Sequence, residues 1–173
     1  MPSYAALDVA QETTAICVVD DEGRIRAEKM VPTCPNAISD FLTDGAPELV
    51  RVGMETGPLA VWLWNELTER QVPIICMDAR HANAALKMRP VKTDRNDAAG
   101  LAQIVRTGWF KQVRIKSRSN YQIRSLLTAR EMLVRTRVRI ENELRGLLRT
   151  FGVLFGKRVG SFTKRADEII AGE

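Results

Sequence analysis

The sequence has few of the residues on which several common kinds of site depend. Its 173 residues include one histidine, His81, and three widely spaced cysteines, Cys17, Cys34 and Cys76. An odd number of dispersed cysteines argues against a disulfide framework and a zinc site, and places the chain in a reducing cytoplasm. Nucleophilic catalysis by serine or cysteine would depend on the single histidine as its base, which argues against that chemistry too.

Long apolar runs and phosphate-binding loops are also missing. No stretch approaches the roughly 18 to 20 apolar residues of a membrane-spanning helix, and the first residues, MPSYAALDVAQE, lack the basic and apolar regions of a secretory signal. Neither GxGxxG nor GxxxxGKS/T occurs, which disfavours a nucleotide-binding doubly wound fold. With 45% hydrophobic residues, the chain can still bury a core. We therefore expect a folded protein with no membrane partner.

The charge is divided unevenly along the chain. The total is +5, but residues 1–86 carry 6 basic and 13 acidic side chains, whereas residues 87–173 carry 20 basic and 8 acidic ones. Between Asp97 and Glu131 there is no acidic residue. A basic tract of this kind is typical of a protein that binds a polyanion such as nucleic acid, although a solvated charged helix would look the same. The basic side chains that we expect to contact nucleic acid are Arg106, Lys111, Arg114, Lys116, Arg118, Arg124, Arg130 and Arg137.

The first 80 residues predict an α/β domain. Three strands are expected at 4–9, 13–19 and 24–31, with a hairpin turn at Asp20 to Gly23. A helix capped by Asn36 follows, then a strand at 49–54, a helix near 59–70 and a strand at 73–77. Three strands in meander, then helix, strand, helix and strand, is the order of an RNase H-like mixed sheet with flanking helices. We place this domain at 1–112.

A long helix is predicted after the domain, within a basic helical, coiled-coil-like segment at 113–173. Residues 119–151 contain no proline and one glycine, and their apolar residues recur close to every 3.5 positions. Arg130 and Arg137 interrupt this seam, where an unpaired buried charge would be costly. The seam indicates a helix that self-associates into a homodimer or higher oligomer. A helical hairpin packed on the domain is the alternative.

Four carboxylates are the candidate catalytic and metal-binding residues. Asp8 lies in the middle of an apolar strand, where it needs a compensating partner, and Glu55 ends the fourth strand, where α/β sheets bind their ligands. Asp94 and Asp97 share one face at the start of a helix, although simple capping would explain them as well. If all four converge, divalent cations must neutralise them, and oxygen ligands suit Mg²⁺ or Mn²⁺. A two-metal site of this kind is typical of phosphodiester transfer.

Four aromatic residues have alternative roles. Trp62 and Trp64 lie two apart in a predicted helix, so we expect Trp62 in the core and Trp64 nearer the surface. Trp109 and Phe110 adjoin the basic tract, where they could stack on a nucleobase, but packing in the core is the expected role.

The motifs ALDVAQETTAICVVDDEGRI, VGMETG and VKTDRNDAAGLAQIVRTG resemble the N-terminal DEDD domain of insertion-sequence transposases of the "one-ten" family, which are bacterial recombinases related to pilin-gene invertases and similar in fold to RuvC resolvases. The resemblance covers about residues 4–160. It implies that Asp8, Glu55, Asp94 and Asp97 form a metal-binding tetrad for DNA strand cleavage and transfer, that the long helix dimerises, and that a structured guide RNA directs the enzyme to DNA. Family members continue into a serine-bearing domain, which we expect this chain to lack and to need for full activity.

Three alternatives remain open from the sequence. The chain could be a nucleic-acid-binding and dimerisation module without catalysis of its own, or a RuvC-like junction resolvase. An actin-like or sugar-kinase-like ATPase is suggested faintly by Asp8 with Thr13 and Thr14, but no second glycine-rich phosphate loop accompanies them.

Overall fold

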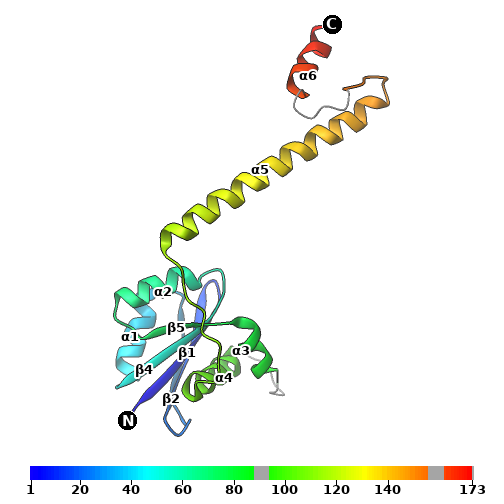
Figure 1. The fold of residues 1–173 in the computed structure, drawn as a ribbon. Coiled ribbons are helices and arrows are strands. Elements are labelled where there is room, and N and C mark those ends of the chain that lie inside the picture. Colours follow the sequence, from blue (N-terminus) through cyan, green and yellow to red (C-terminus); the bar gives the residue numbers. More distant parts are fainter. Residues whose placement is uncertain (88–93, 156–161, 173) are drawn as a thin grey trace. The chain divides into compact units, whose positions relative to one another are not determined.

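The computed structural model describes residues 1–87, 94–155 and 162–172, with the backbone alone at 94 and 95. The chain divides into two units, Met1–Lys116 and Ser117–Glu173, which are described separately. The elements of the first unit, labelled in Figure 1, are β1 (Ser3–Val9), β2 (Thr13–Asp20), β3 (Ile25–Pro32), α1 (Pro35–Gly45), β4 (Leu49–Glu55), α2 (Ala60–Glu69), β5 (Ile74–Met77), α3 (Ala79–Leu86) and α4 (Asp94–Thr107).

The five strands form one mixed sheet in the order β3-β2-β1-β4-β5. β1, β2 and β3 are antiparallel neighbours, whereas β4 runs parallel to β1, and β5 parallel to β4. The hairpin between β2 and β3 closes where Asp20 Oδ1 accepts the backbone N–H groups of Glu22 and Arg24, at 3.1 and 2.8 Å. This is the predicted RNase H-like topology, and the predicted fold class is confirmed.

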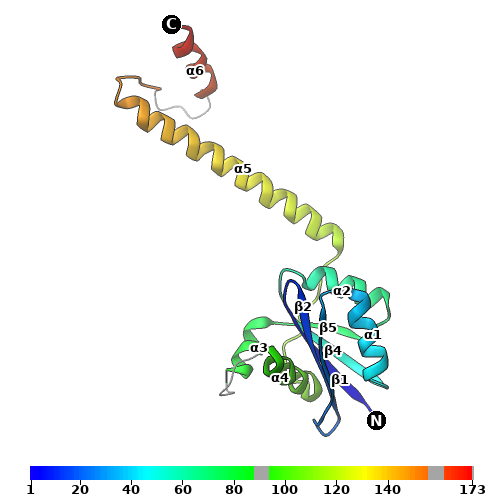
Figure 2. The same ribbon diagram turned by 180° about the vertical axis from the view of Figure 1, so that it is seen from behind.

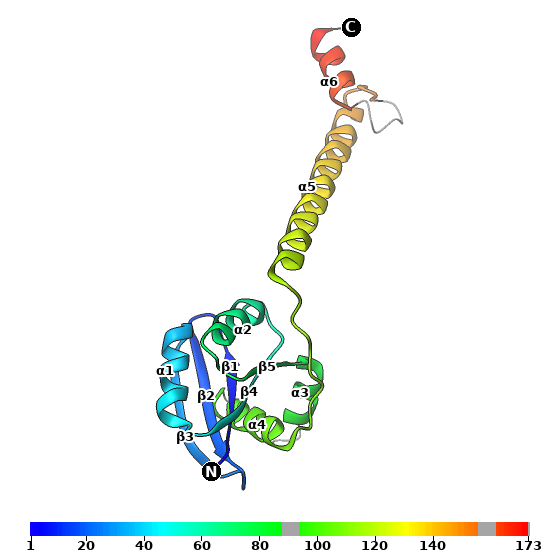
Figure 3. The ribbon, with the colours of Figure 1, turned by 60° about the vertical axis from the view of Figure 1, so that its left-hand side comes forward.

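Each face of the sheet is covered by helices, as Figures 2 and 3 show. On one face, the even-numbered residues of β2 and the odd-numbered residues of β1 pack against α1 and α2, with Ile38, Leu42, Leu63 and Leu67 fully buried. On the other face, Ala6, Cys17 and Val19 pack against α4 and part of α3. The alternation of side chains along a strand therefore assigns each position of β1 and β4 to one helical layer.

α4 approaches the sheet closely because β4 has a glycine beneath it. A Cβ atom at Gly53 would lie 2.2 Å from Val105 Cγ2 of α4 and 3.0 Å from Met77 Cε. Only a residue without a side chain fits such a contact. The glycine thus fixes how deeply the helix sits on this face.

Two predictions about α1 and α2 were wrong. α1 begins at Pro35 with Cys34 as its N-cap, because proline suits the first helical position, where no N–H is needed; Asn36 instead accepts hydrogen bonds from Arg70. Trp62 is exposed and Trp64 packs against the core, the reverse of the expectation, because the buried stripe of α2 runs through Ala60, Leu63 and Leu67.

The second unit contains α5 (Arg118–Arg149) and α6 (Phe162–Ala171). α5 extends over the predicted long helix, but none of its residues is buried, and its apolar seam includes Leu126, which is 71% exposed, and Leu133, which is 66% exposed. In this seam Arg137 pairs with Glu141, at 3.4 Å between Nε and Oε1. Arg145 lies with its guanidinium carbon 4.9 Å from the centre of the Phe162 ring, which connects α5 to α6.

Across the described ranges, we find no helix that combines the length and the apolarity needed to cross a bilayer.

Candidate active site

Asp8 and Glu55 lie side by side at one end of the sheet. β1 and β4 are parallel neighbours whose last paired positions are Leu7 and Met54, so Asp8 and Glu55 are the next residue on each strand. Both are half-buried, and both line a cleft of about 350 Å³ with the loop Thr56 to Leu59. Asp8, which the sequence predicted in the middle of a strand, and Glu55, which it predicted at a strand end, therefore share one cavity.

Both residues belong to the face of the sheet that α4 covers. Asp8 follows Ala6, which is fully buried against α4, at the spacing of two that keeps side chains on one face. Glu55 follows Gly53, above which Val105 of α4 lies, at the same spacing. The carboxylates are therefore on the side of α4 and not on the side of α1 and α2.

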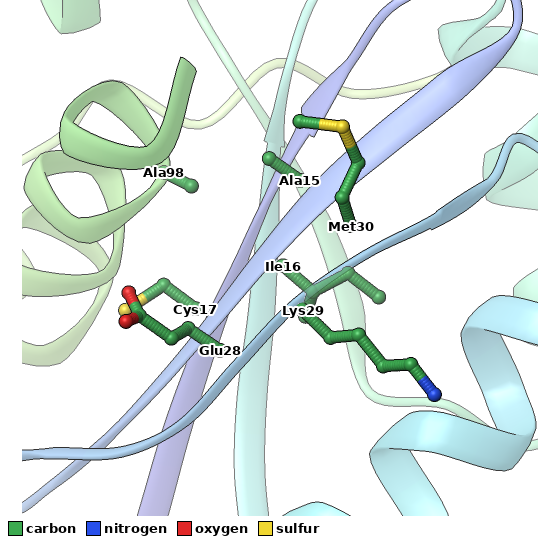
Figure 4. A pocket seen from close by; sticks show the side chains of 7 residues that line it. All are labelled: Ala15, Ile16, Cys17, Glu28, Lys29, Met30 and Ala98. Carbon is green, nitrogen blue, oxygen red and sulfur yellow. The ribbon is translucent and has the colours of Figure 1, made fainter. Parts of the chain in front are cut away.

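The N-terminal end of α4 lies at the end of the sheet that carries Asp8. Ala98, in the second turn of α4, shares a pocket with Ala15 of β2, and Ala15 is the register partner of Asp8 (Figure 4). At the opposite end of α4, Gln103 Nε2 donates to Gly23 O at 2.6 Å and Arg106 Nη1 donates to Asp21 O at 2.9 Å, which ties the helix to the β2–β3 hairpin. The helix thus runs from the carboxylate end of the sheet toward the hairpin end.

This direction places Asp97 at the same end of the sheet as the cleft. Asp97 immediately precedes Ala98 and stands one helical turn before Leu101, which is 1% exposed against the sheet. Asp94 is the first residue of α4, and its side chain lies outside the described part of the structure. A helix N-terminus carries partial positive charge, so the direction of α4 favours negative charge at this end of the sheet.

α3 contributes an unpredicted neighbour of Glu55. Asn83 Nδ2 donates to Glu55 Oε2 at 3.3 Å and to Ala79 O at 2.8 Å, which fixes the amide against the carboxylate. Thr56 Oγ1, next to Glu55, accepts the backbone N–H of Ala79 at 3.2 Å. No motif in the sequence marked Asn83; the strand end at Met77 followed by Asp78 is the signal from which α3 could have been predicted, since Asp78 caps it.

The donor set of this region suits a hard divalent cation. Asp8, Glu55 and Asp97 offer only carboxylate oxygens, and these are the ligands that Mg²⁺ and Mn²⁺ prefer. Among the described side chains, no group of three or more His, Cys, Asp or Glu residues is arranged to hold a metal ion. The chemistry of these side chains fits the group, Asp8 and Glu55 share one cleft, and Asp94 is the fourth predicted member.

The predicted nucleic-acid contacts differ in their surroundings. Arg106 is half-buried and donates to Asp21 O and to Gln103 Oε1. Its guanidinium therefore has a structural role. The other seven are exposed: Lys111, Arg114, Lys116, Arg118, Arg124, Arg130 and Arg137.

Trp109 does not pack in the core, contrary to the expectation, and is 69% exposed. It follows Gly108, whose φ of 73° turns the chain outward after α4. Phe110 does pack against the buried cluster beneath α4, with Arg51 over its ring at 5.6 Å.

The comparisons with known proteins agree with these features. A family model described as a transposase, for the DEDD domain of IS110-type elements, matches residues 5–152. The transposase for insertion sequence element IS1111A of Coxiella burnetii is 24% identical over 167 residues, which are 96% of this chain and 44% of that protein. The chain thus spans less than half the length of this relative.

Similar solved structures include Thermus thermophilus RuvC, with a TM-score of 0.45 and 15% identity over 65% of this chain and 99% of that one. The same protein in complex with a Holliday junction substrate has a TM-score of 0.46 and 18% identity, over 65% and 100% of the two chains. The family model covers most of the sequence, including Asp8, Glu55 and the start of α4. The chain therefore belongs to the IS110-type family of DEDD transposases.

Proposed function

We propose that this chain is the metal-binding part of a DNA transposase, in which Asp8, Glu55, Asp94 and Asp97 hold Mg²⁺ or Mn²⁺. The observation that carries the proposal is the direction of α4, whose N-terminal end lies at the sheet end where Asp8 and Glu55 share a cleft. Divalent ions held by these oxygens would activate the attacking oxygen and stabilise the leaving oxygen of DNA strand cleavage and transfer.

The residues around the carboxylates have supporting roles. Asn83 donates to Glu55 and would hold that carboxylate in one orientation. The N-terminal dipole of α4 stabilises the negative charge that the four carboxylates concentrate. Gly53 allows α4 to approach β4 closely, which would help Asp97 to serve the same site as Asp8 and Glu55.

The basic side chains would hold the phosphate backbone of DNA. Six of the seven exposed residues, from Lys111 to Arg130, lie between Asp97 and Glu131, where the sequence has no acidic residue, and Arg137 follows Glu131. Each Lys or Arg that neutralises a phosphate contributes to binding with little sequence preference. Sequence choice would then come from a structured guide RNA, as the family resemblance implies, and α5 would bring two copies together.

The test is Asp8→Asn, with Asp40→Asn as the matched control. Asp40 is an exposed carboxylate on α1, which covers the opposite face of the sheet. Mn²⁺ at ten times its dissociation constant should stabilise the wild-type chain by about 1.4 kcal/mol, an effect that Asp8→Asn should abolish and Asp40→Asn should leave intact. In a transposition assay with the rest of the transposase present, only Asp8→Asn should stop DNA strand cleavage. Full transposition by Asp8→Asn would refute the proposal.

A second function is a nucleic-acid-binding and dimerisation module without catalysis. The exposed seam of α5 and the basic side chains that flank it favour this alternative. Binding of DNA or RNA by this chain with steep salt dependence, together with no effect of Mn²⁺ on stability or of Asp8→Asn on cleavage, would select it.

A further inference from the structure

A groove lies on the side of α3 that does not face Glu55. It has a volume of about 830 Å³, and its lining includes Arg80, His81 and Ala84 of α3 and Trp109 and Lys111 from the turn after α4. Arg80, His81, Trp109 and Lys111 are all exposed. The groove is therefore lined by basic side chains and by one large exposed aromatic side chain.

The backbone holds Trp109 firmly although its indole is open to solvent. Phe110, the next residue, is anchored in the core, and its backbone N–H bonds Gly108 O at 3.0 Å. One residue further, Lys111 O accepts the backbone N–H of Asp78 at 2.9 Å, which ties the turn to the start of α3. A rigidly presented, exposed indole is unusual, because burial of its large apolar surface would be favourable. It is suited to stacking on a flat partner.

The charges in the groove identify the partner as an anion with an aromatic part. Arg80 and Lys111 are cationic, and His81 adds a third nitrogen donor. Asp78, a carboxylate close to them, caps α3 and accepts the backbone N–H groups of Arg80 and His81 at 2.9 and 3.3 Å. These hydrogen bonds, that of His81 first, hold the pKa of the Asp78 carboxyl below its usual value. A nucleotide combines a planar base for Trp109 with phosphates for Arg80 and Lys111.

The groove adjoins the candidate active site through α3. Asn83 contacts Glu55, and Ala84, the following residue, lines the groove. A strand that passes the carboxylates could continue over α3 into the groove.

We propose that this groove grips an unpaired segment of a nucleic-acid strand, with Trp109 stacked on one base and Arg80 and Lys111 on neighbouring phosphates. The base must be unpaired, because inside a duplex its faces are covered by adjacent base pairs. The proposal rests on the proposed function for its partner class, but the groove itself needs no metal. Single-stranded DNA and single-stranded RNA share the chemistry that the groove recognises, and both are tested.

The first experiment uses a chain in which Trp109 is the sole tryptophan, Trp62→Phe with Trp64→Phe. Oligonucleotides are added in EDTA, so that metal binding plays no part. Stacking should quench the fluorescence of Trp109 with single-stranded DNA, single-stranded RNA or both, and much less with a blunt duplex of the same length. Unchanged Trp109 fluorescence, or quenching by an acidic peptide such as polyglutamate alone, would overturn the proposal.

The second experiment compares affinities by fluorescence anisotropy. Trp109→Ala should weaken single-strand binding about tenfold, as expected for the loss of one stacked base, and Trp109→Phe should restore most of it. Trp62→Ala, at an exposed tryptophan of α2, is the matched control and should bind as the wild type does. Arg80→Gln with Lys111→Gln should reduce the slope of log K against log salt by about 1.4, the value for two phosphates of a single strand.

The outcomes separate this proposal from the function of the carboxylates. Wild-type single-strand affinity in Trp109→Ala contradicts the groove whatever Asp8→Asn does. Loss of affinity in Trp109→Ala together with full activity of Asp8→Asn supports the groove and refutes the metal site.

Discussion

Asp8 shows how a single residue can indicate a site. Its strand neighbours Ala6 and Leu7 are fully buried, so a carboxylate at the next position would be costly in a closed core. The sequence therefore predicted a compensating partner. The structure places Asp8 at a cleft with Glu55, a second carboxylate, which adds to the negative charge that a partner must neutralise. Charge that is held where two strands end is a feature of ligand sites in α/β sheets.

Cys76 gives a prediction at the residue scale that depends on pH. The thiol is 1% exposed, and burial raises its pKa to about 11, from an ordinary value of 9.0. Because the folded chain holds this proton more tightly than the unfolded chain does, the stabilisation is complete below pH 9 and is lost as the pH rises toward 11. The free energy of unfolding measured in urea should fall as the pH rises over this interval. It should fall less steeply for Cys76→Ala than for Cys34→Ala. Equal slopes for the two variants would contradict the assignment.

The sequence identified residues whose place follows from a local pattern. It did not identify a role or an exposure that depends on tertiary packing. Asp8 and Glu55 could be found because strand periodicity and a following turn fix where they lie. Asn83 could not, because it reaches Glu55 only through the packing of α3. Trp109 was named as a residue that could stack on a base, but its exposure could not be predicted, because the backbone at Gly108 turns it outward.

At the scale of the elements, the contact of α4 with β4 fixes how closely the helix that carries Asp97 lies on the sheet. Gly53→Ala would place a methyl group 2.2 Å from Val105 Cγ2, so the helix or the strand must move. Overpacking of this kind costs about 1 to 3 kcal/mol. Urea denaturation should show this loss for Gly53→Ala, and Val105→Ala in the same chain should recover part of it. Gly57→Ala is the control, because a Cβ atom there meets nothing within 4 Å; equal stability of the two alanine variants would exclude the close contact.

α5 should self-associate through its apolar seam. A helix with Leu126 and Leu133 this exposed gains by covering them, at about 1.5 to 3 kcal/mol for each leucine fully buried. Leu126→Gln with Leu133→Gln should weaken the dimer at least tenfold in sedimentation equilibrium. Thr128→Gln, which replaces an exposed residue off the seam, should leave the dimer unchanged. A monomeric wild-type chain at high micromolar concentration would contradict this role of α5.

The elements were predictable where hydrophobic periodicity is strong. The strands of the sheet and the long helix agree with the pattern within one or two residues at most ends. α3 was missed, because its eight residues, ARHANAAL, contain a single large apolar residue. Short helices of this kind are fixed by their caps and by tertiary contacts more than by their own pattern.

At the scale of the whole molecule, the uneven charge matches the two proposed functions, metal binding and DNA binding. The acidic half supplies Asp8 and Glu55, and the basic half contains the aspartates of α4 and the exposed arginines of α5. The change of sign near residue 86 is therefore not a boundary between units, because α4 packs on β1, β2 and β4 of the first unit. Negative charge is concentrated where metal is proposed, and positive charge where DNA is proposed.

The salt dependence of affinity measures DNA binding by the basic side chains directly. Arg124→Gln with Arg130→Gln should lower the slope of log K against log salt for duplex DNA by about 1.8, if each arginine neutralises one phosphate. Asp167→Asn, which removes a negative charge on α6, is a control for the effect of net charge alone. An unchanged slope in the arginine variant would show that Arg124 and Arg130 do not contact the phosphates of the duplex.

The central claim is that the carboxylates of β1, β4 and α4 hold divalent cations together. A crystal structure of the chain soaked in Mn²⁺, with anomalous difference density, tests this most directly. We expect a peak among Asp8, Glu55, Asp94 and Asp97, at about 2.0 to 2.2 Å from their oxygens, close to the distance for Mg²⁺. Carboxylates of α4 directed away from Asp8 and Glu55, with no peak between them, would contradict it.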